Sequence, residues 1–183
     1  MRFRRPEVKY LGHWVSKDGI APLSSRVEDL RVFPAPSTKQ GLQRFLGMLN
    51  YYRRFVPKLA DVLLPLHAAV SEAGKKKDIK WTNACQDAFS KAKEALASAT
   101  LLHHPSPFAG TRLAVDASNS AIGAELSQYG VGRGWCPIAF YSKSLTPAEK
   151  KYSAFDRELL AIYLFIDQTL QTFFRGQKFS CSL

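Results

Sequence analysis

The fold class is decided by residues 112–128, which read RLAVDASNSAIGAELSQ. Apolar residues alternate at the start of this stretch, with Leu113 and Val115 on one face and Ala114 and Asp116 on the other, as in a half-buried strand. Turn-forming residues interrupt the stretch once, and a glycine-rich turn follows it. The pattern predicts an antiparallel meander of three strands, at residues 112–117, 121–128 and 137–144.

A long helix is expected after the meander, over residues 154–173. Ser153 and Asp156 form its capping pair. A fourth strand is expected to begin at Lys178 and to continue to Leu183, where the sequence ends. The order β-β-β-α-β is typical of an α/β or α+β layer. The stripe predicted to face the sheet consists of Leu159, Ile162, Phe165, Ile166 and Leu170.

The first hundred residues are mostly helical in pattern. Residues 8–15 read as one strand that ends in a turn at 16–19. Ser25 with Glu28 is expected to cap a short helix that stops before Pro34, and Ser37 with Gln40 is expected to cap a longer one. The longer helix carries a stripe with the spacing of a buried face, namely Leu42, Phe45, Leu46, Leu49 and Tyr52.

Further helical segments lead toward the meander. Residues 59–72 form an apolar segment that includes Pro65, and residues 74–78 read as a solvated hinge loop. Thr82 is expected to cap a helix over residues 83–98. Residues 103–107 contain two prolines and predict a stiff extended linker. The buried face of the 83–98 helix is expected to consist of Cys85, Phe89, Ala92 and Leu96.

The composition is that of a globular protein, with 46% hydrophobic and 22% charged residues and a net charge of +11. The charge is concentrated at the start, since residues 1–60 hold 12 Lys/Arg against 4 Asp/Glu. A basic segment of this kind favours a polyanionic partner such as nucleic acid. Charge alone leaves a merely soluble basic surface equally open.

Cysteine usage and hydropathy bear on the compartment. Cys85, Cys136 and Cys181 are far apart and form no CxxC pair, so neither a disulfide framework nor a zinc site is indicated. No apolar run approaches the roughly 18 residues that span a membrane. The N-terminus lacks the apolar region of a signal peptide. We expect a soluble protein of a reducing compartment, in the cytosol or nucleus.

Two carboxylates are candidates for chemistry. Asp116 stands near the end of an apolar strand, and Glu158 lies early in the long helix. If that helix packs on the meander, the two acids can point at one another, and hard oxygen ligands of this kind suit Mg²⁺. Their mutual repulsion without metal is expected to raise the pKa of at least one of them. A turn-forming Asp and a Glu that complements the helix dipole are the alternative.

Several motifs together resemble the polymerase of gypsy-class long-terminal-repeat retrotransposons. Residues 8–20, VKYLGHWVSKDGI, look like the strand and turn near the end of the palm. The thumb signature of the family is similar to FPAP at 33–36 and LQRFLGMLNYYRRF at 42–55. The connection segment resembles WT at 81–82 and CQDAF at 85–89. The RNase H-like domain resembles VDAS at 115–118, AIGA at 121–124, YSKSL at 141–145, PAEK at 147–150, YS at 152–153 and ELLAI at 158–162.

The resemblance implies a division into three parts: palm end and thumb-like helices at 1–73, a connection at 74–107, and a truncated RNase H-like domain at 108–183. It implies that Asp116 and Glu158 are the first two of the family's metal-binding, catalytic carboxylates, with Mg²⁺ as cofactor. The implied partners are an RNA–DNA hybrid or a DNA duplex and the rest of a Pol polyprotein, with no small-molecule substrate. The residues implied to contact nucleic acid are Leu11, Gly12, His13, Lys39, Arg44, Arg53, Arg54 and Lys58.

The sequence departs from the family pattern in two ways. The polymerase requires an aromatic residue followed by an Asp-Asp pair, and no Asp-Asp occurs in this sequence. The third RNase H carboxylate is expected beyond Phe179, and residues 179–183 read FSCSL. Two carboxylates alone are expected to hold Mg²⁺ weakly or not at all. The chain is therefore expected to bind nucleic acid without catalysing a reaction alone; a catalytically silent scaffold module retained by a host is the alternative.

Overall fold

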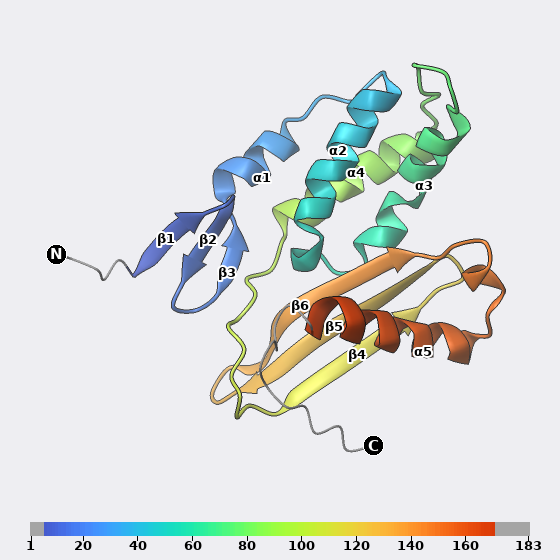
Figure 1. Cartoon of the computed structure of the whole chain (residues 1–183). Helices are drawn as coiled ribbons and strands as arrows, with labels where there is room; N and C mark the ends of the chain where they lie inside the picture. The colour runs from blue at the N-terminus through green and yellow to red at the C-terminus, as the bar shows by residue number, and fades with distance from the viewer. Residues whose placement is uncertain (1–5, 171–183) are drawn as a thin grey trace.

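The computed structural model describes residues 6–170. Within these residues the chain forms a small sheet, a group of helices and a larger sheet crossed by one helix (Figure 1). This is the mixed α/β arrangement that the sequence predicts. None of the helices in residues 6–170 is both long and apolar enough to cross a membrane.

The small sheet is an antiparallel arrangement of β1 (Glu7–Tyr10), β2 (His13–Ser16) and β3 (Ile20–Pro22). The prediction of one strand over residues 8–15 is wrong, because the chain reverses at Leu11 and Gly12. Both residues have positive φ, 45° and 77°, as two-residue hairpin loops require. The turn predicted at 16–19 is confirmed by a hydrogen bond of 2.9 Å from Ser16 N to Gly19 O.

The helices form the next group along the chain. They are α1 (Ser24–Arg31), α2 (Lys39–Tyr51), the short 3₁₀ helix η1 (Arg53–Phe55), α3 (Leu59–Glu72) and α4 (Asn83–Ala97). Both predicted stripes are confirmed, since every member of the α2 and α4 stripes is buried. Their side chains form one apolar core that also contains Phe140 of the larger sheet. The helices are therefore packed against that sheet as well as against one another.

The caps of these helices were only partly predictable. Thr82 caps α4 as expected, because its hydroxyl accepts a hydrogen bond from the backbone N–H three residues on. Ser37 and Ser25 do not act as the predicted caps: Thr38 caps α2 in the same manner, and Leu23 precedes α1 without a side-chain cap. The capping pattern fits several neighbouring polar residues, so the local backbone conformation decides which one is used.

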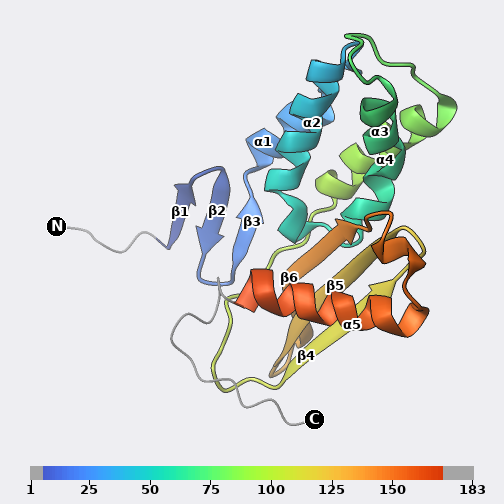
Figure 2. The same ribbon diagram turned by 45° about the vertical axis from the view of Figure 1, so that its right-hand side comes forward.

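The larger sheet is the predicted meander, with order β4 (Thr111–Ala117), β5 (Ala121–Gly130) and β6 (Gly134–Ser144). The neighbouring strands are antiparallel, and Asp116 lies opposite Gly123. After the short helix η2 (Glu149–Lys151), α5 (Ala154–Phe165) runs across one face of the sheet (Figure 2). Ile122, Ala124 and Leu126 of β5 pack there against Ala161 and Phe165 of α5.

The chain is helical from Ala154 to Leu170, within the predicted range, but the helix changes type on the way. The α-helix ends at Phe165 and continues as a π-helical turn, η3 (Ile166–Leu170). The fourth strand expected at 178–183 lies outside the described residues. The cap is confirmed, since Ser153 Oγ accepts a hydrogen bond of 3.1 Å from Asp156 N.

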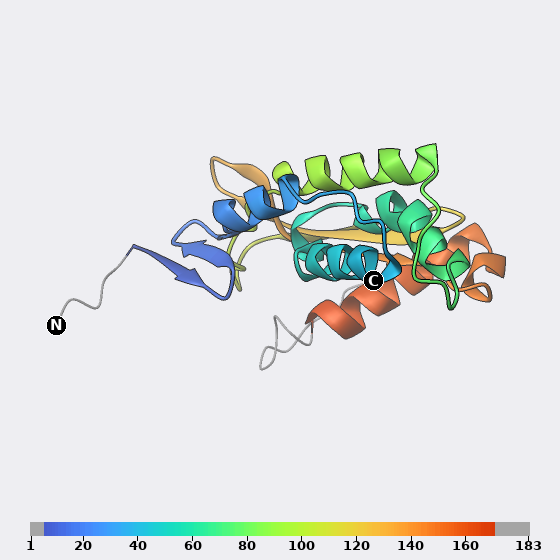
Figure 3. The same ribbon diagram turned by 90° about the horizontal axis from the view of Figure 1, so that it is seen from above.

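The predicted stripe of α5 is only partly confirmed. Phe165 is buried, whereas Leu159 and Ile166 are 55% and 43% exposed. The helix has apolar residues on more than one side, so periodicity alone does not identify the side that meets the sheet. Viewed from above, α4 and α5 run along opposite sides of the molecule (Figure 3).

Candidate nucleic-acid interface and carboxylate site

The β1–β2 turn is fixed to the end of α2 by two tyrosine hydroxyls. Tyr51 Oη donates a hydrogen bond to Leu11 O, and Tyr52 Oη donates one of 3.3 Å to Gly12 O. Gly12 O also accepts a hydrogen bond of 3.0 Å from Leu23 N. A Cβ on Gly12 would lie 3.0 Å from Tyr52 Oη at a φ of +77°, so this close approach requires glycine. The turn expected to contact nucleic acid and the thumb-like helix are therefore held together as one unit.

His13 follows this turn and packs among aromatic rings. Its ring centroid lies 5.2 Å from that of Tyr51 and 5.4 Å from that of Phe55. Burial, followed by the charge of Arg54, lowers the pKa of His13. Its Nε2 is buried and has no hydrogen-bond partner among the described residues. A neutral ring in an aromatic cluster supports the turn sterically, and the contact with nucleic acid expected of His13 stays a prediction.

The basic residues predicted to bind nucleic acid fall into two groups. Arg44 and Arg53 are exposed and form no ion pair with a carboxylate in the part of the chain that the structure describes. Arg54 lies over the Phe55 ring, 5.6 Å from the centroid, and burial lowers its pKa. Lys39 Nζ donates a hydrogen bond of 2.5 Å to Gly74 O. Arg44 and Arg53 therefore present charged groups without a carboxylate partner among the described residues, and their contact with nucleic acid stays a prediction.

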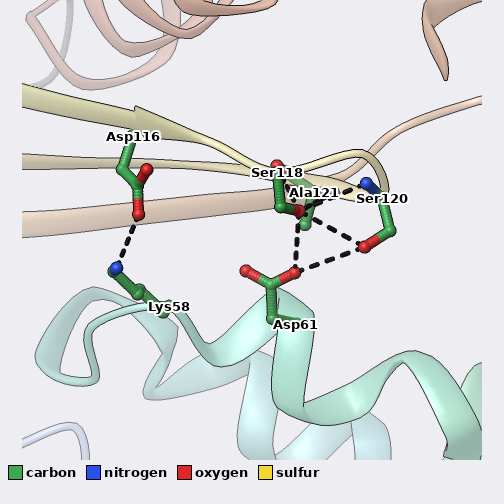
Figure 4. Close-up of polar contacts among 6 residues, drawn as sticks. All are labelled: Lys58, Asp61, Asp116, Ser118, Ser120 and Ala121. Atoms are coloured by element: carbon green, nitrogen blue, oxygen red, sulfur yellow. Dashed lines mark hydrogen bonds and ion pairs between the residues drawn. The ribbon is translucent and has the colours of Figure 1, made fainter.

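Lys58 and Asp116 were predicted for different roles, and the structure brings them together (Figure 4). Lys58 Nζ lies 2.5 Å from Asp116 Oδ2, and both side chains are largely exposed. The hydrogen bond from Lys58, followed by its charge, holds the pKa of Asp116 below its usual value. Asp116 is therefore not an acid whose pKa is raised by repulsion, because its nearest charged neighbour is a cation.

More polar contacts surround this ion pair, where the start of α3 meets the larger sheet (Figure 4). Ser118 Oγ donates a hydrogen bond of 3.1 Å to Asp61 Oδ1, and Ser120 Oγ donates one of 3.5 Å to the same atom. In addition, Ala60 N donates a buried hydrogen bond of 3.1 Å to Ser142 Oγ. The first turn of α3 is thus joined to the β4–β5 turn and to β6.

Glu158 lies apart from this cluster. Its side chain is exposed on α5 and makes no hydrogen bond or ion pair with the described residues. Val115 packs toward α5, so strand alternation places Asp116 on the opposite face, where Lys58 meets it. The structure therefore shows no contact that joins the two acids, and their expected catalytic pairing stays a prediction.

The donors in residues 6–170 do not fit a divalent-metal centre by themselves. No group of three or more His, Cys, Asp and Glu side chains in this range is arranged to hold a metal ion. The one acid at the β4 terminus is already paired with an ammonium group. Hard cations such as Mg²⁺ need several oxygen ligands around one point, so further carboxylates would have to come from outside these residues.

Comparison with known proteins agrees with this architecture. The family model described as "RNase H-like domain found in reverse transcriptase" matches residues 81–181. The chain belongs to this family. The family generally uses divalent metal ions.

Relatives in the same family are much longer than this chain. The Tf2-3 and Tf2-4 transposon polyproteins of Schizosaccharomyces pombe are each 33% identical to it over 162 residues. That alignment covers 87% of the chain and 12% of each polyprotein. The chain thus spans about an eighth of the length of these relatives, and it matches the reverse transcriptase/RNase H-like part of a retrotransposon polyprotein.

Solved structures extend the likeness to the whole described fold. A foamy viral protease-reverse transcriptase in complex with an RNA/DNA hybrid matches with a TM-score of 0.79 and 25% identity. The match covers 94% of this chain and 23% of that one. A foamy viral protease-reverse transcriptase dRH in complex with double-stranded DNA matches equally well, with the same TM-score and identity. The likeness includes residues before 81, which the family model does not reach.

Sequence reasoning missed the groups that hold the site together. The adjacent tyrosines at 51 and 52 stand in the thumb-like motif, but nothing in the motif shows that their hydroxyls bind a turn 40 residues earlier. No spacing signal links Ser142 to α3. Such contacts depend on how distant segments pack, which a local pattern does not encode.

Proposed function

We propose that this chain binds a nucleic-acid duplex, either an RNA–DNA hybrid or DNA, through the β1–β2 turn and the arginines of α2 and η1. The observation that supports this best is the pair of tyrosine hydroxyls that fixes Leu11 and Gly12 to the end of α2. A turn and a helix held in one orientation can contact a strand terminus and its backbone without ordering first, which lowers the cost of binding.

Electrostatics favour the same surface. Arg44 and Arg53 are exposed, and neither forms an ion pair with a carboxylate of residues 6–170. Residues 1–60 as a whole carry 12 Lys/Arg against 4 Asp/Glu. Backbone contacts of this kind neutralise phosphates and release counterions, independently of base sequence. The structural relatives that were solved with RNA/DNA hybrid and double-stranded DNA support a duplex as the ligand.

Catalysis by the chain alone is not part of the proposal. The sequence contains no Asp-Asp pair for polymerisation, and the described acids do not fit a divalent-metal centre. We propose that Mg²⁺-dependent hydrolysis of a hybrid requires carboxylates from the remainder of a Pol polyprotein, in addition to Asp116 and Glu158. The thumb-like motif at 42–55 supports assignment of that polyprotein to the gypsy class.

Binding is tested by fluorescence anisotropy with a labelled hybrid of about 18 base pairs at several salt concentrations. If about three to five phosphates are contacted, log affinity should fall with log salt at a slope of roughly −3 to −4. The double variant R44Q/R53Q should weaken binding and make the slope shallower by about 1 to 2.

The matched control is K150Q/K151Q, which removes two lysines of η2, a helix that is not part of the proposed interface. It should leave affinity and slope close to those of the wild type. No hybrid binding at about 50 mM salt, or equal losses in the two double variants, would contradict the proposed interface.

A further inference from the structure

The end of the larger sheet at the β5–β6 hairpin carries exposed aromatic rings. Tyr129 and Trp135 are paired across the two strands and are 54% and 45% exposed. Their ring centroids lie 5.6 Å apart with an interplanar angle of 73°. Side chains of this size usually bury 150–250 Å² in a core or interface, so two exposed neighbours indicate a binding surface rather than a structural need.

An arginine is stacked on this pair. The Arg112 guanidinium lies 4.6 Å from the centroid of the Trp135 ring, and it forms no ion pair with a carboxylate of residues 6–170. Stacking orients the guanidinium while leaving its N–H groups able to bind an anion. The surface formed by Arg112, Tyr129 and Trp135 is called the aromatic platform below.

The aromatic platform lies on the sheet face that α5 does not cover. Along β5, Ile122, Ala124 and Leu126 pack beneath α5, so Tyr129 has the opposite orientation by strand alternation. The start of α3 and η1 cover this second face toward its other end, where Lys58 meets Asp116 and Phe140 joins the core of the helices (Figures 1 and 4). The hairpin end of the face is left open by the described residues.

The platform is held in place by contacts at the hairpin tip and beside β5. Arg133 of the tip forms an ion pair of 3.4 Å with Asp18 in the β2–β3 turn. Tyr129 N donates a hydrogen bond of 2.9 Å to Gly110 O, and the nearby Phe108 is 96% exposed. The rings are therefore presented by a sheet whose position is fixed, with a further aromatic residue close in the chain.

We propose that the aromatic platform binds single-stranded nucleic acid, with bases stacked on the rings and a phosphate bound by Arg112. Exposed aromatic residues on a sheet face bind unpaired bases in this way, with stacking tolerant of sequence. A duplex hides its base faces, whereas a single strand offers them. The proposal rests on the proposed function in taking nucleic acid as the ligand, but it concerns a different surface and a different form of that ligand.

The test measures anisotropy of a labelled oligothymidylate of about 12 nucleotides with the 183-residue chain. W135A and R112Q should each weaken its binding about fivefold or more. W135F keeps a ring and should retain most of the affinity. The matched control is F155A, which removes an exposed aromatic residue of α5 and should bind as the wild type does.

Two further measurements separate this proposal from duplex binding. The oligonucleotide should quench tryptophan fluorescence in the wild type, and W135F should lose most of that quenching. R44Q/R53Q should weaken hybrid binding much more than oligothymidylate binding, and W135A should show the reverse pattern.

Three results would overturn the proposal. The first is that the wild type binds the hybrid but not oligothymidylate. The second is that W135A and F155A bind oligothymidylate with equal affinity. The third is that W135A alters only the self-association of the chain, as measured by sedimentation, and leaves oligothymidylate binding unchanged. The last result would identify the platform as a protein interface. Oligothymidylate binding by the wild type without any hybrid binding would contradict the duplex proposal alone.

Discussion

Replacement of Ser142 by alanine should destabilise the junction between α3 and the larger sheet. Ala60 is the second residue of α3, so its N–H has no acceptor within the helix. The residue before the helix, Lys58, provides no side-chain cap. Ser142 of β6 supplies the acceptor instead, at 3.1 Å, with both residues at most 9% exposed. A helix cap therefore comes from another part of the fold.

The size of the expected destabilisation follows from the burial of the Ala60 N–H. S142A leaves a buried N–H without an acceptor, which costs about 1–3 kcal/mol. For a protein of this size, each kcal/mol shifts the melting temperature by roughly 2–4 °C. We therefore expect the melting temperature to fall by about 2–12 °C.

Thermal unfolding and hydrogen exchange followed by mass spectrometry measure the effect. Backbone amides at the start of α3 should exchange faster in S142A than in the wild type. The control is S127A, which removes a buried hydroxyl whose bond to Glu125 Oε1 stays within β5. S127A should leave exchange in α3 unchanged. Wild-type exchange rates at the start of α3 in S142A, or an unchanged melting temperature, would refute the reasoning.

Three other predictions concern single side chains. D116N should lower the melting temperature slightly at neutral pH, because Lys58 depresses the pKa of Asp116 in the folded state. The difference between variant and wild type should begin to shrink as pH falls below about 4 and should vanish only below the lowered folded-state pKa. It should also shrink in about 1 M salt. The pKa of His13 is lowered, so protonation favours unfolding, and stability should decline as pH falls below about 6.5; H13F should flatten that decline in melts between about pH 5 and 7.5. T82A should destabilise α4 by about 1 kcal/mol in urea melts, whereas T82S should keep the cap and most of the stability.

Local sequence patterns determined much of the secondary structure. The meander followed from period-two alternation and turn residues, and the buried faces of α2 and α4 followed from helical spacing. Thr82 and Ser153 were identifiable as caps because a capping hydroxyl acts on a backbone N–H only three residues away, so the pattern is local in the sequence. Both hydroxyls make this contact in the structure. The family was identifiable as well, since its motifs recur in order along the chain. All of these features depend on residues that are close in sequence.

The tertiary structure decided how those elements meet. Tertiary packing determines which side of α5 faces the sheet, and Leu159 is exposed although helical periodicity predicted its burial. It also placed Lys58 against Asp116 and directed that carboxylate away from the α5 face. Contacts between segments 40 to 82 residues apart, such as Tyr52 with Gly12 and Ala60 with Ser142, have no local signature. They form because burying the shared apolar core brings distant polar groups together, and those groups must then find partners in one another.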